Sequence, residues 1–216
     1  MTGPPSGRTQ VRRAPDRGAY DRATIDAILD EGLVCHLGFV VDGTPRVIPT
    51  GYARDGDRVL LHGSRTSASM RALAAGAEAC VTVTLLDGLV LARSAFHHSM
   101  NYRSVVVLGA AVEVADPVAK AEALRVLTDH LVPGRSADAR PASPRELEVT
   151  TVVAVPLDEA SAKVRTGGPS DDVEDHGLAV WAGVIPLDLR PSAPLDDPGV
   201  APGAPAPAYV TGYRRP

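Results

Sequence analysis

The stretch LVCHLGFVVDGTPRVIPTGYARDGDRVLLHG, residues 33–63, decides the fold class. It contains three apolar runs, separated by the dipeptides Asp42–Gly43 and Asp55–Gly56. An Asp-Gly pair between apolar runs is a strong hairpin signal, because both residues tolerate the positive φ that tight hairpin turns require. The stretch therefore predicts a three-stranded antiparallel meander.

Outward from this meander, strands and helices are interspersed. Helices are predicted at residues 20–32, 67–76 and 116–134, from apolar spacing, N-cap residues and terminal glycines. Residues 78–96 predict a further hairpin at Asp87–Gly88, and residues 135–146 predict a loop. With strands in 104–115 and 147–164, the chain has six or seven short strands. We therefore expect a mainly antiparallel β-barrel with helices.

The length and charge of the chain exclude several classes of protein. Its 216 residues suit one domain at 20–187, preceded by a flexible arm at 1–19 and followed by a Pro/Ala/Gly-rich tail at 188–216. A net charge of -4 without a Lys/Arg cluster argues against a nucleic-acid partner. No apolar run is long enough to span a membrane, and no signal peptide is visible, so we expect a cytoplasmic protein.

A hydroxyl-rich loop between a strand and a helix, residues 62–69, is a candidate anion site. The N-terminus of a helix presents free N–H groups, and serine and threonine hydroxyls add donors beside them. Arg65 and Arg71 add positive charge. Ser64 and Ser67 could equally be ordinary helix caps, and the sequence leaves both interpretations open.

Two more segments have unusual composition. In RVIPTGY, residues 46–52, Pro49 and Gly51 favour either an edge strand or a strand that a flat ligand can approach closely. In FHHSMNYRS, residues 96–104, polar and ring-bearing side chains directly precede a buried strand. His97 and His98 have no further ligand nearby in the sequence, so a metal site is not expected. No nucleophile elbow or dinucleotide-binding glycine motif is present.

The order and spacing of these segments resemble the pyridoxamine 5'-phosphate oxidase-like flavin-nucleotide-binding proteins. The similarity runs over roughly residues 17–187, and NYRSV at 101–105 resembles the branch that contains the 5-nitroimidazole-resistance proteins. The resemblance implies an antiparallel split β-barrel that forms a homodimer, with FMN bound at the subunit interface. The C-terminal Arg-Leu-His and Arg-Leu-Pro patterns of the true oxidases are missing, so vitamin B6 synthesis is not expected.

The resemblance also assigns roles to residues. It places one strand against the isoalloxazine ring, the hydroxyl-rich loop on the ribityl phosphate, and the segment before the buried strand at the mouth of the flavin site. Relatives often carry Arg or Lys where this chain has Ala68, and we expect Arg71, or else Arg65, to replace that cation. The implied FMN-binding residues are Arg46, Val47, Ile48, Pro49, Thr50, His62, Gly63, Ser64, Ser67, Arg71, Asn101, Tyr102, Arg103 and Ser104.

The function that this resemblance implies is an FMN-dependent oxidoreductase. The flavin would accept hydride from a reduced nicotinamide and pass electrons to a small acceptor; the sequence identifies no catalytic side chain. One alternative is a flavin-binding carrier or sensor without turnover. Another is a member of the superfamily that binds haem or a deazaflavin, with His62, His97 or His98 as an axial haem ligand.

Overall fold

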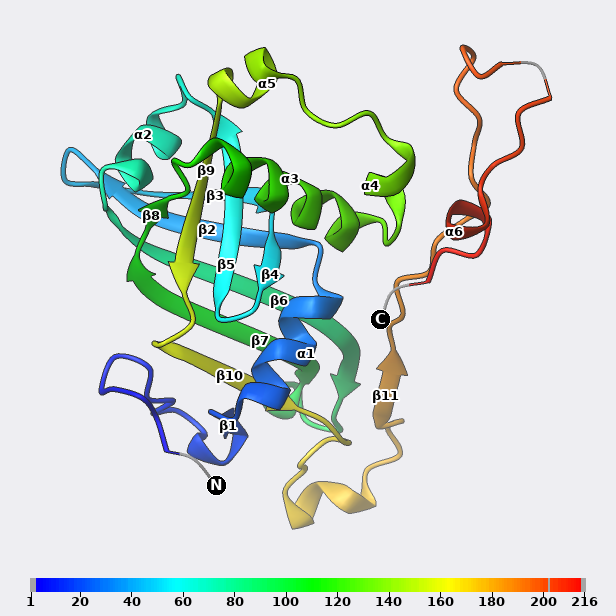
Figure 1. Ribbon diagram of the computed structural model, residues 1–216. Coiled ribbons are helices and arrows are strands. Elements are labelled where there is room, and N and C mark those ends of the chain that lie inside the picture. The colour runs from blue at the N-terminus through cyan, green and yellow to red at the C-terminus, as the bar shows by residue number, and fades with distance from the viewer. Residues whose placement is uncertain (1–2, 202, 215–216) are drawn as a thin grey trace.

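The computed structural model describes residues 3–201 and 203–214, which form two antiparallel β-sheets and several helices (Figure 1). The strands are β1 (Gly18–Ala19), β2 (Val34–Val41), β3 (Thr44–Gly51), β4 (Ala53–Asp55), β5 (Arg58–Ser64), β6 (Glu78–Leu91), β7 (Ser99–Ala110), β8 (Val112–Glu113), β9 (Thr150–Pro156), β10 (Ala160–Arg165) and β11 (Gly183–Pro186). The helices are α1 (Arg22–Glu31), α2 (Ala68–Ala74), α3 (Pro117–Leu131), α4 (Arg135–Asp138), α5 (Pro144–Val149) and α6 (Ala208–Thr211), with single 3-10 turns at Pro15–Arg17, Ala95–His97 and Val173–Gly177.

The strands divide into a seven-stranded and a four-stranded sheet. The first sheet has the order β1-β10-β7-β6-β2-β3, with β11 paired to β6, and the second has the order β4-β5-β9-β8. Every recorded pairing is antiparallel. The predicted class, mainly antiparallel β with helices, is confirmed. The strands hydrogen-bond as two separate sheets, so the split barrel stays a prediction.

The meander at residues 33–63 is divided between the two sheets. Asp42, Gly43 and Gly56 adopt the positive φ expected of the two turns. However, β3 pairs with β2 in the first sheet and β4 pairs with β5 in the second, so the three predicted strands are not one sheet. The chain changes sheets at Tyr52, which is fully buried and donates a 2.6 Å hydrogen bond to the Leu29 carbonyl at the end of α1.

The end of α1 is closely packed against this corner. At Gly32, which follows the helix, a Cβ atom would lie 2.4 Å from the Tyr52 hydroxyl oxygen and 2.5 Å from a methyl group of Val83. These distances are far below van der Waals contact, so only glycine leaves room for Tyr52 at this position. The sequence had indicated only that Gly32 ends the helix.

The hairpin predicted at Asp87–Gly88 is wrong. β6 continues through both residues and pairs with β7 on either side of them, with a register shift between Leu86 and Gly88. Such a shift is a β-bulge, in which one strand accommodates an extra residue. The bulge frees Asp87, whose carboxylate binds the Arg103 guanidinium of β7. The pairing of β6 with β7 therefore produces a bulge at Asp87–Gly88, where the dipeptide alone would favour a turn.

The loop predicted at residues 135–146 contains helical turns. α4 follows Gly134, and α5 begins with a capping box in which Ser143 and Glu146 bind each other's backbone N–H groups, with Pro144 at the first helical position. Serine followed three residues later by glutamate is a known sequence signal for the start of a helix, but the composition of the segment favoured a loop. In the part of the C-terminal tail that the structure describes, residues 188–201 and 203–214, α6 is the one helix.

The hydrophobic core has a large and a small part. The large part fills the space between the inner faces of the two sheets, α1 and α2. The small part lies between the second sheet and α3, and consists of Ala53, Leu60, Val114, Ala123, Leu127, Val152 and Ala154. Both cysteines are unpaired, and burial raises the pKa of the Cys35 thiol to about 12, so this thiol is unreactive. Among the described residues, no helix is both long and apolar enough to cross a bilayer.

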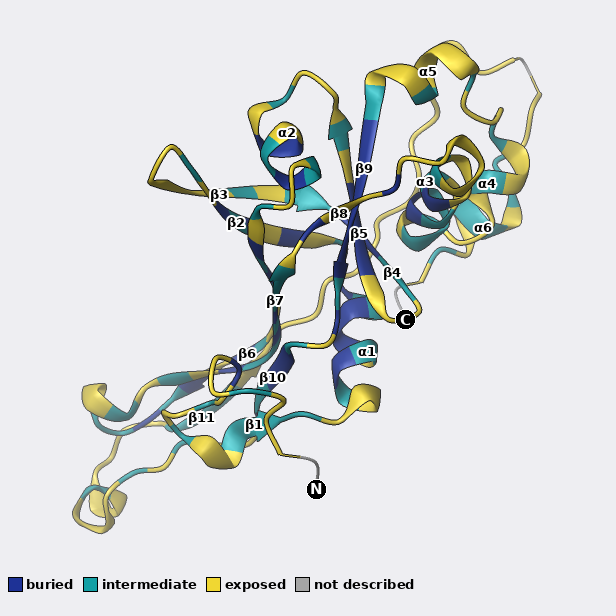
Figure 2. Cartoon of the chain, turned by 60° about the vertical axis from the view of Figure 1, so that its left-hand side comes forward, coloured by how far each residue is buried: buried dark blue, intermediate teal, exposed yellow. Residues whose placement is uncertain are grey.

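The outer face of the seven-stranded sheet is left uncovered. Strand residues alternate between faces, so the buried residues Leu37, Val83 and Val105 point inward and their neighbours point outward. β3 is exposed over most of its length (Figure 2). Directly paired residues share a face, so Ile185, Leu89 and Met100 form one apolar row across β11, β6 and β7. The exposed apolar side chains on this face include Val34, Val40, Val47, Leu86, Leu89, Met100 and Ile185.

Candidate functional site

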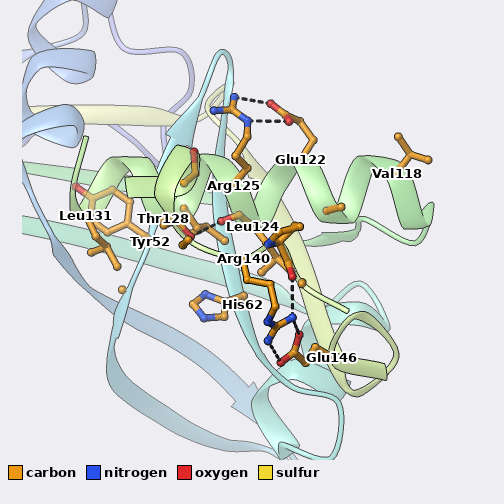
Figure 3. Close-up of a pocket in the computed structure, with 17 residues that line it drawn as sticks. Tyr52, His62, Val118, Glu122, Leu124, Arg125, Thr128, Leu131, Arg140 and Glu146 are labelled. Carbon is orange, nitrogen blue, oxygen red and sulfur yellow. Dashed lines mark hydrogen bonds and ion pairs between the residues drawn. The ribbon is translucent and has the colours of Figure 1, made fainter. Parts of the chain in front are cut away.

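A cavity of about 730 Å³ lies between α3, the second sheet and the segment that joins α3 to α5 (Figure 3). It adjoins the small hydrophobic core, with which it shares Leu127. Its volume is in the range of pockets that bind cofactors or substrates. It is lined by Gly51, Tyr52, His62, Val118, Ala121, Glu122, Leu124, Arg125, Leu127, Thr128, Leu131, Ser136, Ala139, Arg140, Pro141, Ala142 and Glu146.

His62 is the one imidazole on this lining. It lies two residues beyond Leu60 on β5, so both side chains face α3. Within residues 3–201 and 203–214, the structure gives its ring no hydrogen bond or ion pair. The His62 side chain is exposed to solvent at the cavity. The protein atoms around it nevertheless lower the pKa of His62 below its ordinary value of 6.5, because they disfavour the charged form. A neutral imidazole with free ring nitrogens therefore faces the cavity.

The inner end of the cavity is apolar and rigid. Leu124, Leu127 and Leu131 repeat along one face of α3 at helical spacing. Tyr52 is held at this end by its hydroxyl, as described above, and its ring lies 5.1 Å from that of His130. The Nε2 atom of His130 lies 2.7 Å from the Gly32 carbonyl oxygen, to which it donates. The terminal carbonyls of α1 thus fix both rings.

The rim of the cavity carries two arginines. Arg125 binds Glu122 at 2.6 Å and Asp129 at 2.9 Å, and Arg140 binds Glu146 at 2.7 Å. The Arg140 guanidinium, together with the Ser143 backbone, holds the pKa of Glu146 at about 2. The cavity therefore combines a neutral nitrogen ligand, apolar walls and guanidinium groups at the mouth. These groups fit a flat, largely apolar ligand that carries a metal and peripheral acidic groups, such as haem.

The strand predicted to contact the flavin lies elsewhere. Residues 46–50 belong to β3, the edge strand of the first sheet, and none of them lines the cavity. Val47 and Pro49 point to the outer face, whereas Ile48 packs against the large core. The open edge and the outer face leave this strand accessible to a flat ligand.

The predicted flavin residues on β7 are separated from β3 within one chain. Tyr102 and Ser104 lie on the outer face, where the Ser104 hydroxyl donates to the Lys163 carbonyl at 3.3 Å. Three strand spacings separate β7 from β3, which is about 14 Å. The two groups of residues therefore do not converge on one pocket of a single chain.

Asn101 and Arg103 of β7 point to the inner face and stabilise local structure. Arg103 binds the carboxylates of Glu31 and Asp87, which joins α1 to the bulge in β6. The side-chain oxygen of Asn101 accepts a hydrogen bond from Arg165, and its nitrogen donates to the Gly167 carbonyl at 3.1 Å. These polar groups are engaged within the chain.

The hydroxyl-rich loop has the geometry of a donor cluster. Ser67 stands at the N-cap of α2, but its hydroxyl makes no capping bond and lies 2.8 Å from that of Ser69. The Ser64 hydroxyl contacts Thr66 at 2.9 Å. The Arg71 side chain reaches back from the helix and donates to the Thr66 carbonyl at 2.6 Å. Arg65 contributes a backbone hydrogen bond to Val149. Gly63 is in close contact with Met70, as a Cβ there would lie 2.9 Å from that side chain.

The other two candidate haem ligands are outside the cavity. His97 contacts the Asp172 carboxylate at 3.0 Å, and the Nδ1 atom of His98 donates to the Ser94 carbonyl at 3.0 Å. Both belong to the exposed segment between β6 and β7. The Trp181 side chain is 64% exposed and is not part of the core.

Comparisons with known proteins agree with this architecture. The family model described as pyridoxamine 5'-phosphate oxidase matches residues 21–164. The chain belongs to this family. No curated protein shows significant sequence similarity to this family member. Several solved structures do resemble it, and the two described next are more than 40% identical to it.

The flavocytochrome Anf3 from Azotobacter vinelandii is 43% identical, with a TM-score of 0.93 over 99% of both chains. The FAD and heme binding protein from Mycobacterium smegmatis is 41% identical, with a TM-score of 0.87 over 91% of this chain and 96% of its own. A protein from Bacteroides thetaiotaomicron, assigned to 5-nitroimidazole antibiotic resistance, is 24% identical, with a TM-score of 0.58 over 68% of this chain and 86% of its own. The predicted family is thus confirmed.

Most of the residues that line the cavity were not predicted from the sequence. His62 was the one predicted site residue on the lining; Tyr52, Arg125 and Arg140 were not predicted. The α3 face had a visible helical period, but nothing in the sequence indicates that Leu124, Leu127 and Leu131 line a cavity. The segment that forms the outer wall had been predicted as a plain loop.

Proposed function

We propose that this chain is a two-cofactor redox protein that binds haem and a flavin nucleotide. Electrons from a reduced nicotinamide would reach a small acceptor through these cofactors. The observation that carries the proposal is the His62 imidazole, free and neutral in an apolar cavity. The flavocytochrome and the FAD and heme binding protein support it, because they match this chain over 99% and 91% of its length.

The haem would occupy the cavity beside α3. His62 would supply an axial nitrogen, the leucine face of α3 would cover the ring, and Arg125 or Arg140 would pair with the propionates at the mouth. The iron would supply one-electron chemistry when bound. The lowered pKa of His62 keeps the nitrogen lone pair available at neutral pH, since a protonated imidazole cannot bind a metal.

The flavin would lie on the opposite side of the molecule, on the outer face of the first sheet. We propose that a second copy of the chain covers this face and forms a homodimer, in a split-barrel arrangement of the two sheets. The apolar row of Ile185, Leu89 and Met100 supports this, because a monomer rarely exposes such a surface without function. A second copy could also bring residues of its β7 to the β3 of the first.

Our sequence prediction is FMN, whereas the Mycobacterium smegmatis relative binds FAD. Both contain the same ring, ribityl chain and first phosphate, so the hydroxyl-rich loop at residues 63–67 would serve either one. Arg71, which already reaches back over this loop, is the cation that we expect to pair with the phosphate.

Absorption spectroscopy and mass spectrometry of the purified protein test the proposal. We expect a Soret band and flavin bands together, and a nicotinamide-driven bleaching of the flavin bands under anaerobic conditions. A protein with neither set of bands, and with no uptake of added haem and flavin, would contradict the proposal. Both cofactors without reduction by NADH or NADPH would favour the carrier or sensor alternative.

A further inference from the structure

The outer wall of the cavity, residues 132–143, has the features of a lid. It comprises the turn Val132–Gly134, the single turn of α4 and an extended stretch before α5. Most of its residues are exposed, and none is fully buried. Segments with few buried contacts open at a lower free energy than the core of a protein. Its inner side contributes Ser136, Ala139, Arg140, Pro141 and Ala142 to the cavity lining.

On its inner side the lid is held by two polar contacts. The Ser136 backbone N–H donates to the Asp129 carboxylate of α3 at 2.9 Å, and its hydroxyl donates to the same group at 2.5 Å. At the other end, Arg140 binds Glu146 of α5. These contacts hold Ser136 and Arg140, whereas the Asp138 carboxylate, which lies between them, takes its support from another segment.

The C-terminal segment 207–213, which we call the strap, provides that support from outside. α6 lies beside α4 in both views (Figures 1 and 2). The Tyr209 hydroxyl donates to the Asp138 carboxylate at 2.6 Å and accepts from the Arg135 guanidinium at 3.0 Å. Its ring also packs on the backbone, since a Cβ at Gly134 would lie 3.8 Å from it.

A second tyrosine of the strap holds the hinge of the lid. The Tyr213 hydroxyl donates to the Leu131 carbonyl at 3.0 Å, at the last residue of α3. The Leu131 side chain lines the cavity. The strap therefore contacts Leu131, directly before the lid, and Arg135 and Asp138 within it. These residues lie more than 70 positions from the strap in sequence.

We propose that the strap is a latch that keeps the lid closed and so controls exchange of the molecule in the cavity. The strap links the lid, through Tyr209, to the end of α3, through Tyr213, so opening of the lid away from α3 must break the bonds of one tyrosine or the other. Each such bond is therefore part of the free energy that opposes opening. The identity of the occupant as haem rests on the proposed function, whereas the opening of the lid does not.

Hydrogen exchange of the full-length protein, measured by mass spectrometry without added haem, tests the latch directly. We compare wild type with Tyr209→Phe, Tyr213→Phe and the double variant. A net hydrogen bond of ordinary strength corresponds to about a fivefold change in an equilibrium. Residues 132–143 should therefore exchange up to about fivefold faster in each single variant, and fastest in the double variant.

Tyr20→Phe is the matched control, because it removes a tyrosine hydroxyl that accepts from the Val11 backbone at 2.8 Å, in the N-terminal region. It should leave exchange in residues 132–143 unchanged. Tryptic cleavage after Arg135 gives a second readout in the same proteins. Unchanged exchange and cleavage in the double variant, with an intact core, would overturn the latch.

Haem transfer to excess apomyoglobin then links the latch to the cavity. The double variant should release haem faster than wild type by the same factor as its lid exchange, and Tyr20→Phe should not. If no variant takes up haem, the proposed function fails while the exchange test still decides the latch. If haem is bound but its release does not follow lid exchange, the lid does not control the cavity.

Discussion

The cavity beside α3 and the outer face of the first sheet are built in opposite ways. The cavity is lined by side chains from β5, α3 and the lid of one chain. The outer face is open, and the residues predicted to bind flavin lie about 14 Å apart on β3 and β7. We infer that haem binding depends on the fold of one chain, whereas flavin binding depends on two chains meeting. Haem binding and flavin binding should therefore respond to different substitutions.

The largest effect is expected from His62→Ala. Loss of the axial nitrogen should abolish the Soret band of the purified protein while flavin absorbance persists, because the outer face is untouched. His97→Ala and His98→Ala are matched controls, since both rings lie outside the cavity lining. A Soret band of full intensity in His62→Ala would refute the assignment of the haem site.

The next effect concerns the second copy. Leu89→Asp introduces a charge into the middle of the apolar row, and burying it without a partner costs several kcal/mol. We expect at least about a hundredfold weaker dimer in analytical ultracentrifugation, with parallel loss of flavin and full retention of haem. Val112→Asp, on the exposed strand β8 of the other sheet, is the control. A monomer that keeps its flavin would contradict the two-chain site.

A smaller effect is expected in the phosphate loop. Ser64→Ala or Ser67→Ala removes a neutral donor to a charged phosphate, worth about 1.5 to 3 kcal/mol, so FMN should bind about tenfold or more weakly. Riboflavin, which lacks the phosphate, should bind as before. The Ser67 hydroxyl does not cap α2, so Ser67→Ala should hardly change the unfolding free energy. Equal losses of FMN and riboflavin binding would exclude a phosphate site.

The smallest effect follows from the titration of His62. Its pKa is lowered in the folded chain, so below pH 6.5 the unfolded chain binds more protons than the folded one. The unfolding free energy of the haem-free wild type should therefore fall, relative to His62→Ala, as the pH drops through 6.5. Urea denaturation at several pH values measures this difference. A wild type that instead gains stability relative to His62→Ala as the pH drops would contradict the lowered pKa.

The sequence predicted the parts of the fold that depend on local chemistry. Asp116 caps α3 as predicted, and Asp42–Gly43 makes its turn. It failed at Asp87–Gly88 because the same dipeptide can form a turn or a bulge, and pairing with a distant strand decides between them. It likewise could not show that Tyr52 turns the chain from one sheet to the other.

The candidate site was predictable only where the resemblance supplied it. The resemblance assigned His62 to the flavin phosphate, with a role as haem ligand as an alternative. In the structure, the His62 side chain lines the cavity beside α3. Strand alternation decides this, since His62 shares a face with Leu60, but the sequence does not say which face α3 covers. The contacts of the strap could not be predicted from the sequence, because they join segments far apart in the chain.

The packing at Gly32 has a consequence for how variants of this protein should be read. Gly32→Ala would rank as one of the mildest exchanges by chemical similarity, and the residue lies on neither the cavity lining nor the outer face. Yet the added methyl group would occupy the space of the Tyr52 hydroxyl, whose ring forms the inner end of the cavity. Among natural homologues, the amino acid at this position is therefore a marker of whether the cavity is preserved, although it never touches what the cavity holds.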